Sequence, residues 1–130
     1  MSWSLDARIP VRLLHPSELT TAMVQARTPF ALLAAEAADL TRYLPGPSPA
    51  LHAALARFAP GGPRHAAACA CCAGRPPVGV ALDRLFQART RGTCTWFETV
   101  LAVVPDDAAR QEVEAALMAD PLSAARFRPG

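Results

Sequence analysis

The stretch VLAVVPDDAARQEVEAAL, residues 100–117, contains the two patterns that decide the fold. It opens with five consecutive apolar residues, which is typical of a strand buried on both faces of a sheet. Pro105 interrupts the apolar run, and Asp106 follows as a good helix N-cap. Apolar residues then recur at helical spacing, at Ala109, Val113, Ala116 and Leu117. A buried strand that leads directly into an amphipathic helix predicts an α/β unit.

Two similar units are indicated earlier in the chain. Residues 9–14 form an apolar run that we interpret as a first or edge strand, because a proline lies near its start. Ser17 is a suitable N-cap for the helix that we expect after this strand. Residues 30–35 are continuously apolar and are typical of a strand covered on both faces, although a helix through Tyr43 fits their alanines equally well.

Three further helices are expected. Ser48 followed by Pro49 is typical of an N-cap and a first helical position, which predicts a short helix over residues 49–58. Asp120 followed by Pro121 predicts a last short helix for the same reason. The clearest amphipathic pattern ends near Gly92, and its apolar positions are Val78, Leu82, Leu85 and Phe86.

Strands that alternate with helices predict an α/β fold: a small, mainly parallel sheet with flanking helices, in a single domain over residues 1–130. The net charge is only +2, and the arginines are scattered among carboxylates, so we expect no nucleic-acid partner. The N-terminus lacks the apolar core of a signal peptide, and no stretch approaches the roughly 20 apolar residues of a membrane span. We therefore expect a cytoplasmic protein with no membrane partner, whose cysteines are thiols or metal ligands.

Three of the four cysteines lie within four residues, at Cys69, Cys71 and Cys72. Thiolates are preferred zinc ligands, and three of them can surround one ion only where the backbone leaves a regular strand. His65, four residues before Cys69, is a candidate for the fourth ligand. We predict a metal site at these residues, for zinc or for a similar ion such as cobalt. The alternatives are buried or redox-active thiols, with His65 as a loop histidine exposed to solvent.

The remaining candidate groups point to no catalytic residues. Cys94 follows a predicted helix of about 14 residues, roughly 21 Å long, so it is a lone core thiol unless the chain doubles back to the cluster. No serine lies in a Gly-x-Ser-x-Gly turn, which gives no support to a Ser/His/Asp triad. The pair Asp106 and Asp107 is explained by helix capping and by its interaction with the helix dipole.

Four motifs follow one another in the second half of the chain. They are Cys69-Ala70-Cys71-Cys72, residues 88–92 (ARTRG), residues 96–101 (WFETVL), and Ala119-Asp120-Pro121 with residues 124–127 (AARF). In this order they resemble the central part of the CobW family of metal-handling GTPases, whose signature is Gly-Cys-x-Cys-Cys and whose members are implicated in zinc or cobalt delivery. The resemblance covers residues 65–127 and, more faintly, residues 8–27, where the start of the first apolar run is similar to the strand that leads into the family's phosphate loop. It implies the front half of a P-loop GTPase domain, with Glu36 similar to the glutamate after the family's second strand.

The chain departs from the family where the phosphate loop would be. That loop needs glycines for close backbone approach and a lysine that reaches the β- and γ-phosphates. Here the stretch is His15-Pro16-Ser17-Glu18-Leu19, and all thirteen basic residues of the chain are arginine. We therefore expect no nucleotide hydrolysis and no bound nucleotide. Ala68 also replaces the glycine that precedes the family's cysteines.

These observations predict a non-catalytic, CobW-like protein that binds zinc or a similar metal and acts as a carrier, sensor or accessory subunit. The fourth ligand is left open between His65, Glu36, Cys94 and water. The alternative is a GTPase-like interaction module that has lost catalysis and pairs with an intact partner or with itself. In that case Trp96 would help to cover an apolar face, together with Trp3, Arg126 and Arg128.

Overall fold

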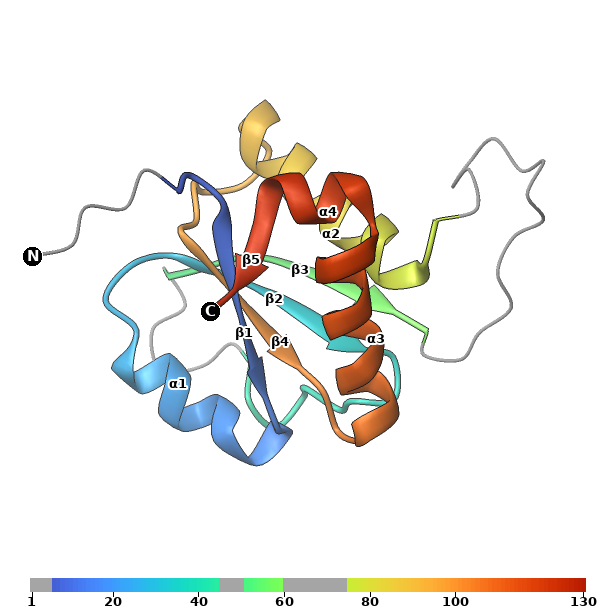
Figure 1. The fold of residues 1–130 in the computed structure, drawn as a ribbon. Coiled ribbons are helices and arrows are strands. Elements are labelled where there is room, and N and C mark those ends of the chain that lie inside the picture. The colour runs from blue at the N-terminus through green and yellow to red at the C-terminus, as the bar shows by residue number, and fades with distance from the viewer. Residues whose placement is uncertain (1–5, 45–50, 60–74) are drawn as a thin grey trace, which may run out of the picture.

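The computed structural model describes residues 6–44, 51–59 and 75–130, and these build a five-stranded, all-parallel sheet (Figure 1). The strand order is β3-β2-β4-β1-β5. The strands are β1 (Ile9–Leu14), β2 (Phe30–Ala35), β3 (His52–Phe58), β4 (Thr99–Val103) and β5 (Phe127–Pro129). The described helices are η1 (Pro16–Glu18), α1 (Leu19–Gln25), α2 (Pro77–Arg91), α3 (Asp107–Ala119) and α4 (Pro121–Arg126). The predicted α/β fold is confirmed.

Helices cover both faces of the sheet and define two apolar layers (Figure 1). Helices α2 and α3 pack on one face against a cluster that includes Leu33 of β2 and Ala102 of β4. On the other face, α1 packs against a cluster that includes Leu32 and Leu101. Strand β2 lies inside the sheet and all six of its residues are buried, which explains its continuous apolar run. None of the helices in the described ranges is long and apolar enough to cross a membrane.

Most local predictions are confirmed. Residues 9–14 and 30–35 are strands, so the helical alternative for the second segment is wrong. Strand β1 is the first strand but lies inside the sheet, and Pro10 is accommodated because the pairing with β4 begins only at Val11. Helix α2 ends at Gly92, whose φ of +73° is a left-handed conformation that favours glycine.

The helix predicted over residues 49–58 is wrong, because residues 52–58 form strand β3. Leu55 and Phe58 have helical spacing in the sequence, yet they point to opposite faces of the sheet: Leu55 is 39% exposed and Phe58 is 2% exposed. The strand pairs with β2 over its whole length, with one register irregularity near Phe30. Backbone pairing and the packing of α2 on this strand outweigh the helix propensity of its alanines.

Candidate functional site

The position where a parallel sheet normally binds ligands lies between β1 and β4. Ligands of open α/β sheets bind outside the carboxyl ends of neighbouring strands whose connections leave on opposite faces. Here the chain leaves β1 for α1 on one face and leaves β4 for α3 on the other (Figure 1). The residues at this point are the turn His15–Glu18 and the segment 104–106.

The turn after β1 uses its own backbone donors. His15 N–H donates to the Glu18 carboxylate at 2.9 Å, and Ser17 N–H donates to His15 Nδ1 at 3.2 Å. Glu18 N–H donates to His15 O at 2.9 Å, and Leu19 N–H donates to Pro16 O. Pro16 has no N–H. The groups that a phosphate loop would direct at a phosphate are therefore bonded within the turn. The N-cap here is His15, which corrects the prediction that Ser17 has this role.

On the β4 side of the same point, Asp106 caps a helix. Its carboxylate accepts a hydrogen bond from Ala109 N–H at 2.8 Å, and Asp107 lies in the first turn of α3. This confirms that Asp106 is the N-cap of α3. We call this position between the carboxyl ends of β1 and β4 the switch point. Both of its sides are thus occupied by helix-capping interactions.

The predicted metal ligands Cys69, Cys71, Cys72 and His65 fall within residues 60–74, which lie outside the described residues. The metal site therefore stays a prediction. In the parts of the chain that are described, no group of three or more His, Cys, Asp or Glu side chains could hold a metal ion.

Two other proposed ligands are described, and they lie at different places. Glu36 follows β2, is exposed, and donates its backbone N–H to Phe58 O at 2.8 Å. It therefore lies beside the end of β3, where the chain leads into the cysteine segment. Cys94 lies beyond the other end of the 15-residue helix α2, is half-buried against the core, and donates to Thr95 O. Burial raises the pKa of the Cys94 thiol.

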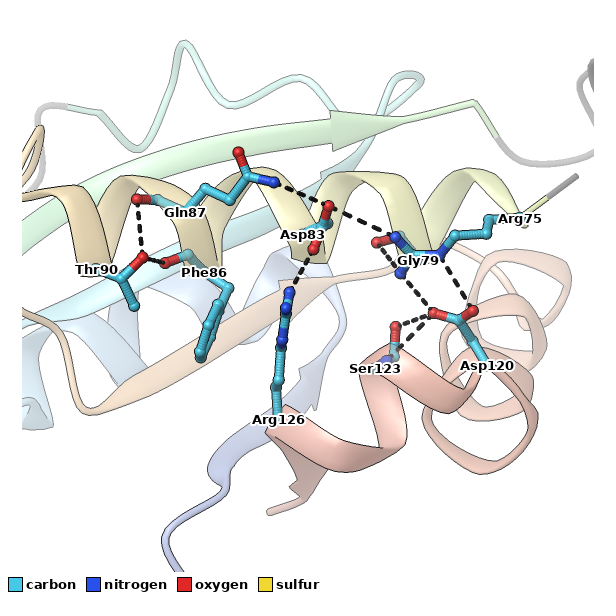
Figure 2. A network of polar contacts seen from close by, with 9 residues as sticks. All are labelled: Arg75, Gly79, Asp83, Phe86, Gln87, Thr90, Asp120, Ser123 and Arg126. Carbon is cyan, nitrogen blue, oxygen red and sulfur yellow. Dashed lines mark hydrogen bonds and ion pairs between the residues drawn. The ribbon is translucent and has the colours of Figure 1, made fainter. Parts of the chain in front are cut away.

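Arg75, three residues after Cys72, is held firmly where the chain leaves the cysteine segment. Its guanidinium donates to Asp120 from Nη2 to Oδ2 at 2.7 Å and from Nε to Oδ1 at 3.2 Å. It also donates to Gly79 O at 3.1 Å and lies 3.5 Å from the Asp83 carboxylate (Figure 2). We call the pair Arg75 and Asp120 the clamp, because it fixes the residues before α2 to the junction of α3 and α4.

The clamp belongs to a larger network between α2 and α4 (Figure 2). Ser123 Oγ donates to Asp120 Oδ2 at 2.6 Å, and Arg126 pairs with Asp83. Position 79 must be glycine for this arrangement, because a Cβ atom there would lie 2.7 Å from Asp120 Oδ2. The network is partly buried and its charges are paired, which is typical of a structural contact between helices.

The charge of Asp120 is maintained although its side chain is only 4% exposed. Burial alone raises the pKa of Asp120, but hydrogen bonds from Arg75 and Ser123 outweigh it and hold the pKa below its ordinary value. The pKa of Arg75 is raised, mainly by its hydrogen bond to Asp120. Both partners therefore stay charged at neutral pH, and neither is suited to general acid or base catalysis.

This shift predicts a measurable pH dependence. Because the folded state binds the Asp120 proton less readily than the unfolded chain, the carboxylate stabilises the fold fully above its unfolded pKa of about 3.9. That contribution is lost as the pH falls through the lower folded pKa. We expect Asp120→Asn, which cannot titrate, to lose less stability than the wild type between about pH 5 and pH 2. Urea denaturation across this range measures the difference, and parallel curves for the two proteins would contradict the prediction.

Comparison with protein-family models, curated proteins and solved structures finds no match.

Proposed function

We propose that this chain is a non-catalytic metal-binding protein of CobW type, which binds zinc or a similar ion through Cys69, Cys71, Cys72 and His65. It would act as a metal carrier, sensor or accessory subunit. The observation that carries the proposal is the concentration of three thiols within four residues, on a segment that leads from the carboxyl end of β3 to the clamped Arg75. Three thiolates and an imidazole match the four-coordinate preference of zinc.

Two features of the described residues support metal over nucleotide as the ligand. The backbone N–H groups of the turn at the switch point donate hydrogen bonds within the turn, and Glu18 adds a negative charge beside them. The turn after β1 therefore offers no free backbone donor of its residues 15 and 17–19 to a phosphate. Glu36, which the sequence offers as an alternative fourth ligand, lies beside the end of β3, the last described strand before the cysteine segment.

The carrier role requires a metal that can be released. The buried residues of the described ranges already form an apolar layer on each face of the sheet. A structural zinc is needed for folding, whereas a carrier folds without its metal. We expect chelation to remove the zinc while the far-ultraviolet circular dichroism and the cooperative thermal transition remain.

The control for this experiment is the chelated protein reloaded with one equivalent of zinc, which should regain its metal content with an unchanged spectrum. Unfolding on chelation would exclude a carrier and indicate a structural ion. Absence of zinc from the protein even after reconstitution under reducing conditions would exclude the metal site itself.

One observation favours the alternative function as an interaction module. Trp96 is 55% exposed, and its ring is held 3.5 Å from the guanidinium carbon of Arg89, which donates to Phe97 O. An exposed tryptophan in a fixed orientation is typical of a contact residue in protein interfaces. Light scattering of the metal-free protein distinguishes the two functions, since a stable dimer without metal would favour the interaction module.

A further inference from the structure

A groove of about 140 Å³ lies between α1 and the face of the sheet that this helix covers. Its floor is apolar and is made by the buried residues Ala22, Phe30 and Leu101. Polar side chains from β1, α1, the segment before β2, and β4 surround the floor: Arg12, Gln25, Thr28 and Thr99. The groove is separate from the clamp, which lies on the opposite face of the sheet.

The polar side chains around the groove are available to a ligand. Within residues 6–44, 51–59 and 75–130, none of these four side chains makes a hydrogen bond or an ion pair. Other threonines of the chain donate to acceptors of their own segment: Thr41 to Asp39, Thr90 to Phe86 O, and Thr93 to Ala88 O. Hydrogen-bond donors without a partner in the described residues thus surround the apolar floor of the groove.

The charge of the groove is positive. Arg12 is the one charged residue among its described lining residues, and it is exposed. The carbonyls at the end of α1 would repel an anion, but Arg27 donates to the carbonyl oxygens of Val24, Gln25 and Ala26 at 3.2–3.3 Å. An anion beside Arg12 therefore meets hydroxyl and guanidinium donors, and no carboxylate is among the described residues that line the groove.

We propose that this groove binds a small organic carboxylate. The carboxylate would pair with the Arg12 guanidinium, for which two parallel hydrogen bonds are the favoured geometry, and would accept from the Thr28 and Thr99 hydroxyls. The apolar part would lie on Phe30 and Leu101. The groove has room for more than a single water molecule, which suits a ligand with a short carbon chain.

Titration of the ¹⁵N-labelled full chain with butyrate, followed by amide chemical shifts, tests the proposal. We expect saturable shifts at residues 25–28 and at Thr99, with a dissociation constant on the order of millimolar. Butyramide has nearly the same shape without the charge, and we expect it to bind at least ~10-fold more weakly. Arg12→Gln should weaken butyrate binding by a similar factor, and Thr99→Val by a smaller one.

The matched control is Arg84→Gln, which removes one exposed arginine from α2 on the opposite face and should leave butyrate binding unchanged. Three results would overturn the proposal: no saturable shifts at the groove amides, unchanged binding in a folded Arg12→Gln variant, or equal binding of inorganic phosphate. The last result would identify a general anion site that makes no use of the apolar floor.

Discussion

Replacing Cys69, Cys71 and Cys72 together with serine is expected to reduce the zinc content of the purified protein from about one ion per chain to none. A serine hydroxyl stays protonated at neutral pH and cannot replace a thiolate, so all three strong ligands are lost at once. Elemental analysis of the untagged protein, purified under reducing conditions, measures the effect directly. Equal zinc content in the wild type and the triple variant would contradict the proposed function.

Cys94→Ser is the matched control for this experiment. It makes the same chemical change in the same chain, but Cys94 is separated from Arg75 by the whole of α2. We expect it to retain the full zinc content, and an unchanged zinc affinity would also exclude Cys94 as the fourth ligand. Comparing the zinc affinities of His65→Ala and Glu36→Gln would then identify the fourth ligand, since only loss of the true ligand should weaken binding substantially.

The sequence predicts best those elements whose local pattern agrees with their environment in the sheet. Residues 100–104 are apolar because β4 lies between two other strands and is covered on both faces. The caps Asp106 and Asp120 could be recognised because each bonds a backbone N–H three residues ahead of it. These signals lie within a few residues of one another, so they can be interpreted without knowledge of the fold.

Strand β3 could not be predicted in the same way. Its sequence HAALARF contains three alanines, which favour a helix when considered alone. It is a strand because β2 offers a parallel partner and α2 packs across it. Strand β5 was not predicted either, since its three residues are held by pairing with β1 and carry no periodic pattern of their own.

The sequence suggests the predicted metal site but not the clamp. The ligands are neighbours in the sequence, so their spacing alone suggests a site. Arg75 and Asp120 are 45 residues apart, and they meet only because α2 and α4 pack on the same face of the sheet. Asp120 was expected to cap a helix, but nothing in its local sequence indicates that it also binds the arginine that follows the cysteine segment.

Asp120→Ala should therefore lower the free energy of unfolding by about 3 kcal/mol, which is more than the same substitution costs at a surface aspartate. The substitution leaves the Arg75 guanidinium without its closest acceptor and removes the side-chain cap of α4. Asp83→Ala is the matched control, because Asp83 also faces Arg75 but its side chain is 22% exposed against 4% for Asp120. We expect that change to cost about 1 kcal/mol, as is usual for a more solvated ion pair.

Urea denaturation of both variants beside the wild type gives the two free energies of unfolding. A larger loss for Asp120→Ala would show that the buried end of the network is the one that stabilises the α2 and α4 contact. Since Arg75 is also where the cysteine segment joins α2, zinc affinity measured on the folded variant then gives a second readout. Weaker zinc binding in Asp120→Ala but not in Asp83→Ala would mean that the clamp positions the metal ligands as well as the helices. Equal destabilisation by the two substitutions would instead show that burial gives Asp120 no special role.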